Sequence, residues 1–118
     1  PICADLEKKP WPLSDCKFNG IIVTNYLHRP LFPFIVRVLD KPGILIYETF
    51  AEGNEAFGRP ANKDYLLLRN ELFNTLSEML HIVSFEQGYV ANPKRAIVQR
   101  VCAIFEDNSM NFQLGREE

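Results

Sequence analysis

The residues of this chain best suited to chemistry lie in one short polar segment, NYLHR, which runs from Asn25 to Arg29. His28 is the natural candidate for a general base, because the unperturbed pKa of an imidazole lies near neutrality. The alternative is that His28 only begins a helix and bonds to the backbone. The residue types alone leave both roles open.

The flanking elements would position this segment. Phe18–Thr24 is β-branched, apolar and uncharged, which predicts a strand buried on both faces. Leu31–Leu39 predicts a helix with Pro30 at its first position, and Asp40–Gly43 is a typical stop signal. Ile44–Thr49 predicts a second buried strand. A strand, a helix and a strand form a βαβ unit, whose crossover is almost always right-handed.

Such a unit has one edge that binds ligands, outside the carboxyl ends of its parallel strands. Asn25–Arg29 follows the first strand and Glu48–Glu55 follows the second, so we expect both polar groups at this edge. The loop Ala51–Lys63 is longer than a typical connection. Phe57 and Arg59 beside glycines favour a loop that contacts substrate over a plain surface loop.

The rest of the chain predicts one further helix and two strands. Arg69–Leu80 has apolar residues at spacings of three and four, typical of an amphipathic helix, and we assign Met79 to core packing. Ile82–Val90 and Ala96–Phe105 are joined by a short connection, which predicts an antiparallel hairpin. Because Ala96–Phe105 is so apolar, we expect it between Ile44–Thr49 and Ile82–Val90.

Composition limits the classes of protein. The chain has 118 residues, is 47% hydrophobic and carries a net charge of −2. We expect one small domain over residues 1–106 and a disordered tail over residues 107–118. Lysine and arginine do not cluster with aromatic residues, which argues against nucleic acid, and no apolar run is long enough to span a membrane. Three cysteines without a CxxC motif favour a reduced, cytoplasmic protein without a metal site.

The order of these elements, together with several segments, resembles the carboxyl-terminal half of the class I, Rossmann-like S-adenosylmethionine-dependent methyltransferases. CADLEKKPWPLSDCKFNGIIVTNYLH is similar to the family's carboxylate after the third strand, the connector and the fourth strand. KPGILIYETF is similar to the fifth strand. NYLHRPLF and ETFAEGNEAFGRPANKDYLL resemble a bacterial subgroup of small methyltransferases. The resemblance covers Ile2–Glu106. It implies an α/β sheet with the family's fourth, fifth, seventh and sixth strands in that order, the seventh antiparallel.

The resemblance implies S-adenosylmethionine as cofactor and gives five residues a part in binding it. Asp5 and Leu6 match the positions that contact the adenine. Asn25, Tyr26 and Leu27 match the segment beside the methionine and the sulfonium. An amide dipole and an aromatic ring would favour that cationic sulfur.

The resemblance also implies a methyl acceptor, which we expect to be a small molecule, although a protein substrate stays open. His28 would be the catalytic base for a protonated acceptor. The residues expected to face the acceptor are Arg29, Tyr47, Glu48 and Arg59. Glu48 would either orient an acceptor amine or pair with Arg29 or Arg59, and we expect the pairing.

The chain departs from the family pattern in one important respect. It contains no GxGxG loop and no acidic residue after a second strand, the features that hold the cofactor's methionine and ribose. We therefore expect a fragment that is inactive alone and that self-associates or pairs with a missing amino-terminal half. The alternative is a half-domain that catalyses nothing and serves as a binding module.

Overall fold

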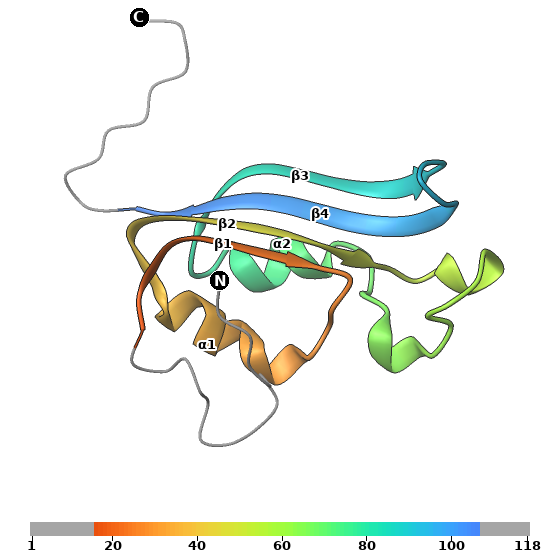
Figure 1. Ribbon diagram of the computed structural model, residues 1–118, viewed down its shortest axis with the longest axis horizontal. Coiled ribbons are helices and arrows are strands. Elements are labelled where there is room, and N and C mark those ends of the chain that lie inside the picture. Colours follow the sequence, from red (N-terminus) through yellow and green to blue (C-terminus); the bar gives the residue numbers. More distant parts are fainter. Residues whose placement is uncertain (1–15, 107–118) are drawn as a thin grey trace, which may run out of the picture.

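A computed structural model describes residues 16–106 of the chain. This part contains a four-stranded sheet in the order β1 (Phe18–Thr24), β2 (Leu39–Phe50), β4 (Ala96–Phe105) and β3 (His81–Val90) (Figure 1). β1 is parallel to β2, whereas β4 is antiparallel to both of its neighbours. The predicted strand order is therefore confirmed. The predictions for Asp5, Leu6 and residues 107–118 lie outside the described residues.

Two short helices pack on the same side of this sheet (Figure 1). α1 (Phe32–Arg37) follows a 3-10 turn at Arg29–Leu31, with Pro30 in the first turn as predicted. α2 (Glu71–Leu76) buries its leucines against the same core, in which Leu45 and Tyr47 of β2 are almost completely buried. None of the described helices is long and apolar enough to cross a membrane.

The other side of the sheet is covered by no described helix. Ile22 is 71% exposed, and its neighbours Ile44 and Ile46 on β2 are 45% and 42% exposed. Ile22 lies directly opposite Ile46 in the parallel ladder. The prediction that β1 is buried on both faces is therefore wrong within residues 16–106. Its sequence is apolar on both sides, but both described helices lie against only one of them.

Several predicted boundaries also differ from the structure. β2 begins at Leu39, so the expected stop at Asp40–Gly43 lies inside this strand. Pro42 is tolerated there because it lies near the start of the strand, before the regular pairing with β1 resumes at Ile44. α2 is only half as long as the predicted helix. Met79 follows it and is 36% exposed, so its assignment to the core is wrong.

Candidate functional site

A cleft of about 520 Å³ opens at the carboxyl ends of β1 and β2. Its lining comes from the segment after β1, the end of β2 and the loop beyond it: Asn25, Tyr26, Leu27, His28, Thr49, Phe50, Pro60 and Tyr65. Four of the ten residues proposed from the sequence thus meet in one cleft. This is the edge at which open parallel sheets bind ligands.

Asn25 turns the chain away from the sheet. Its φ of 56° lies in the left-handed region, which asparagine adopts more readily than most residues. Its N–H donates a 2.9 Å hydrogen bond to the carbonyl oxygen of Glu48, the last contact between the two parallel strands. The residues that follow therefore leave β1 over the edge of the sheet and line the cleft.

His28 begins a helical turn and also lines the cleft. Its carbonyl oxygen accepts a hydrogen bond of 3.0 Å from the Leu31 N–H, so the residue does begin the first helical turn. Its imidazole does not cap that turn, and the half-buried residue lines the cleft. The position is compatible with a base that faces a bound molecule.

Tyr47 lies in the core and holds the segment after β1 that lines the cleft. The residue is only 1% exposed, and its hydroxyl donates a 2.6 Å hydrogen bond to the carbonyl oxygen of Tyr26. Burial of the phenol, and to a smaller degree the neighbouring Tyr26, raise the pKa of Tyr47 far above its ordinary value. Tyr47 therefore remains neutral and holds the segment after β1, and it lines neither this cleft nor the second hollow described below.

Arg29 joins the same segment to the start of α2. Its guanidinium binds both carboxylate oxygens of Glu71, at 2.6 and 2.9 Å, and donates to the carbonyl oxygens of Asp64 and Leu66. Burial alone would raise the pKa of the Glu71 carboxyl. Hydrogen bonds from Arg29 and from the Leu68 N–H, with the charge of Arg29, outweigh burial and lower that pKa. Arg29 thus fastens the segment after β1 to the loop at Asp64 and Leu66 and to the start of α2, and we call its pair with Glu71 a clamp.

Two buried amides fix the loop after β2. Asn54 is 2% exposed; its side chain accepts a hydrogen bond from the Ile97 N–H at 3.0 Å and donates to the Pro60 carbonyl at 3.1 Å. Gln99 is completely buried, accepts from the Leu72 N–H and donates to the Leu68 carbonyl. Neither residue is among those predicted from the sequence. The signal for Gln99 is a polar, uncharged residue in a strand that is apolar apart from Gln99 and Arg100, because a buried amide needs partners.

The remaining proposed residues lie in a second hollow beside the cleft. This hollow has a volume of about 300 Å³ and is lined by Asn25, Glu48 and Arg59, among others. The carboxylate of Glu48 pairs with Arg100 at 3.4 Å, whereas Arg29 pairs with Glu71. The expectation that Glu48 pairs with Arg29 or Arg59 is therefore wrong. Arg100 lies directly opposite Glu48 on β4, and because the two residues are far apart in the sequence, the sequence does not indicate this pair.

Comparison with solved structures finds the same fold in methyltransferases. A SAM-dependent methyltransferase from Methanosarcina mazei matches with a TM-score of 0.58 and 13% identity, over 81% of this chain. TehB from Haemophilus influenzae matches with a TM-score of 0.55 and 15% identity, over 80% of this chain. The chain spans 63% of the first structure and 37% of the second. No protein-family profile and no curated protein matches the sequence. The described residues thus form a mixed α/β fold similar to that of SAM-dependent methyltransferases.

Proposed function

We propose that this chain takes part in S-adenosylmethionine-dependent methyl transfer to a small-molecule acceptor. The observation that carries the proposal is the cleft made by Asn25–His28 at the carboxyl ends of β1 and β2. It occurs in a fold similar to that of SAM-dependent methyltransferases, in which this edge of the parallel strands is the expected ligand edge.

The residues of the cleft suit this reaction. The cofactor would supply an electrophilic methyl group on a cationic sulfur. The amide of Asn25 and the aromatic side chains of Tyr26 and Tyr65 offer dipoles and ring faces to such a cation. His28 would accept the proton that a hydroxyl, thiol or amine acceptor loses, and the walls of the cleft would hold the acceptor in line for displacement.

Part of the cofactor site would lie outside these 118 residues. The sequence has no GxGxG loop, and the chain spans only part of the two methyltransferases it matches. We propose that the segment supplying this loop also covers the open face of the sheet around Ile22 and pairs with β1. A second copy of the chain is the alternative cover for that surface.

Calorimetric titration with S-adenosylhomocysteine tests this proposal. The full gene product should bind with micromolar affinity, and the 118-residue chain should bind weakly or not at all. In the full product, His28→Gln should slow methyl transfer while leaving cofactor affinity unchanged, because it removes the candidate base. Micromolar binding by the 118-residue chain would refute the need for an additional segment. Absence of binding by the full product would refute the proposed function.

A second candidate function is a non-catalytic interaction module. It is favoured by the apolar face at Ile22, Ile44 and Ile46, because exposed apolar patches often mark protein interfaces. The two candidate functions predict different results in the titration with S-adenosylhomocysteine. The module would bind its partner through this face and show no affinity for S-adenosylhomocysteine in any form of the gene product.

A further inference from the structure

The second hollow has an unusual balance of charge. Four cationic side chains line it, Arg59, Lys94, Arg95 and Arg100, against the single carboxylate of Glu48. The chain as a whole is acidic, with a net charge of −2. The cations come from three separate places, the loop after β2, the β3–β4 turn and β4 itself, so the fold brings them together.

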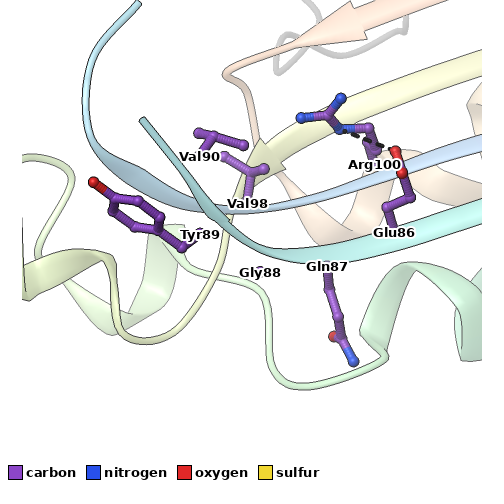
Figure 2. Close-up of a pocket in the computed structure, with 7 residues that line it drawn as sticks. All are labelled: Glu86, Gln87, Gly88, Tyr89, Val90, Val98 and Arg100. Carbon is purple, nitrogen blue, oxygen red and sulfur yellow. Dashed lines mark ion pairs between the residues drawn. The ribbon is translucent and has the colours of Figure 1, made fainter. Parts of the chain in front are cut away.

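Only one of the four cations is neutralised by described residues. The guanidinium of Arg100 lies 3.4 Å from the Glu48 carboxylate and 3.6 Å from the Glu86 carboxylate. Figure 2 shows Arg100 and Glu86 side by side above the β3–β4 pair. Within residues 16–106, Arg59, Lys94 and Arg95 form no ion pair. Positive charge therefore dominates the hollow.

The walls beside these cations are apolar and aromatic. Phe50, Val90 and Val98 line the hollow, and Figure 2 shows both valines on the same side of the hairpin as Arg100. The centre of the Phe57 ring lies 5.9 Å from the guanidinium carbon of Arg95, and the ring packs against Tyr89 at a tilt of 49°, with 5.4 Å between ring centres. A ring fixed in this way offers an apolar surface next to a cation.

We propose that this hollow binds the carboxylate or phosphate group of a small organic molecule with an apolar body. Resting on the proposed function, this molecule is the methyl acceptor. Asn25 and Phe50 line both the hollow and the cleft that contains His28, so the two spaces adjoin. An acceptor anchored by its anion at Arg59 and Lys94 would reach past Phe50 toward His28.

Calorimetric titration of the full gene product with phenyl phosphate and with benzoate tests this inference. No cofactor is added, so a failure to bind anions is read separately from a failure of methyl transfer. Both anions should bind saturably, and neutral benzyl alcohol should bind at least about tenfold more weakly, because charge-assisted hydrogen bonds are the strong ones. Inorganic phosphate should bind more weakly than phenyl phosphate, because it makes no contact with the aromatic wall.

Matched variants separate the hollow from the general charge of the protein. Arg59→Gln with Lys94→Gln should weaken phenyl phosphate binding about tenfold, since both side chains lose charged donors. Arg37→Gln with Arg69→Gln removes the same charge elsewhere and should change the affinity by less than about twofold. The charge-retaining pair Arg59→Lys with Lys94→Arg should preserve binding.

Four results would overturn the inference: no saturable binding of either anion, equal binding of benzyl alcohol, equal losses in both double glutamine variants, or loss of binding in the charge-retaining pair. Tighter binding of heparin than of phenyl phosphate would assign the surface to a macromolecular polyanion and would also refute a small-molecule ligand.

Discussion

The hydroxyl of Tyr47 and the carbonyl oxygen of Tyr26 lie 2.6 Å apart, joined by a hydrogen bond across 21 positions of sequence. Tyr47 belongs to the core strand β2, and Tyr26 belongs to the segment that lines the candidate cleft. This hydrogen bond therefore fixes the segment that carries His28 to the sheet. It gives a residue of the hydrophobic core a direct part in the shape of the site.

Replacing Tyr47 by phenylalanine should lower the free energy of unfolding by about 1–3 kcal/mol, because the partly buried carbonyl of Tyr26 loses its donor. Urea denaturation at neutral pH measures this loss. Tyr65→Phe is the matched control, since Tyr65 is 56% exposed and should tolerate the change within about 0.5 kcal/mol. Equal stability of Tyr47→Phe and the native chain would contradict the role assigned to this hydroxyl.

Tyr47 should also make the protein sensitive to alkaline pH. Its pKa is raised in the folded state, chiefly by burial, so the unfolded chain ionises this phenol first. The resulting stability is complete below the ordinary tyrosine pKa of about 10 and is lost as pH rises above it. Urea denaturation on both sides of that pH should show a smaller decline for Tyr47→Phe. Parallel declines in the two proteins would argue against the raised pKa.

Breaking the clamp between Arg29 and Glu71 should loosen both loops at the cleft. Glu71→Gln should lower the free energy of unfolding at neutral pH by about 1–3 kcal/mol, because a bidentate charged pair is lost. Glu78→Gln is the control, since Glu78 is exposed and forms no ion pair with the described residues. Because the pKa of Glu71 is lowered on folding, its contribution is present above the ordinary carboxyl pKa of about 4.3 and is lost below it. The two proteins should therefore converge in stability under acid.

Asn54 should control the attachment of the loop after β2. Asn54→Ala removes the acceptor for the Ile97 N–H and the donor to Pro60, and should cost about 1–3 kcal/mol. Amide hydrogen exchange should accelerate at Ile97 more than in the centre of β2. The exposed Asn74→Ala should leave both quantities unchanged. A protected Ile97 amide in Asn54→Ala would show that another group holds the loop.

The unpaired edge of β1, next to the exposed face of the sheet, should promote association of the 118-residue chain. Ile22 is 71% exposed on a strand that has one described neighbour, so the strand can pair with another chain. Ile22→Lys should suppress that association at little cost in stability. Leu68→Lys, at a site that is 61% exposed outside the sheet, should not suppress it. Sedimentation at low micromolar concentration measures both, and a native chain that stays monomeric would contradict the prediction.

Several elements could be predicted because each of their signals is local. An uncharged β-branched run, a proline-led helix and a short ANPK turn between apolar runs specify β1, α1 and the β3–β4 hairpin. The cleft followed from the same reasoning, since parallel strands place their carboxyl ends together. The exposed side of β1 agrees with the expectation of a partial fold, but the residue types alone do not indicate it, because an apolar residue such as Ile22 has the same identity on a covered and on an open face.

The remaining features depend on contacts between distant segments. Glu71 lies 42 positions from Arg29, and nothing in either neighbourhood indicates the pair. The cationic hollow exists only because the β3–β4 turn at Lys94 and Arg95 approaches the loop at Arg59. Such juxtapositions are set by the tertiary structure rather than by local sequence, and composition gave no warning of a basic site in an acidic chain.

The loop after β2 is held by uncharged groups, the buried amides of Asn54 and Gln99. A ligand in the second hollow would instead be held by charged side chains. An amide neither titrates nor carries a net charge, so these two anchors keep their strength across changes of acidity and ionic strength. Attraction by Arg59 and Lys94 is screened by salt, over about 10 Å at 0.1 M. A cell that changes its salt content would thus alter the occupancy of the hollow while the loop that carries Arg59 keeps its place.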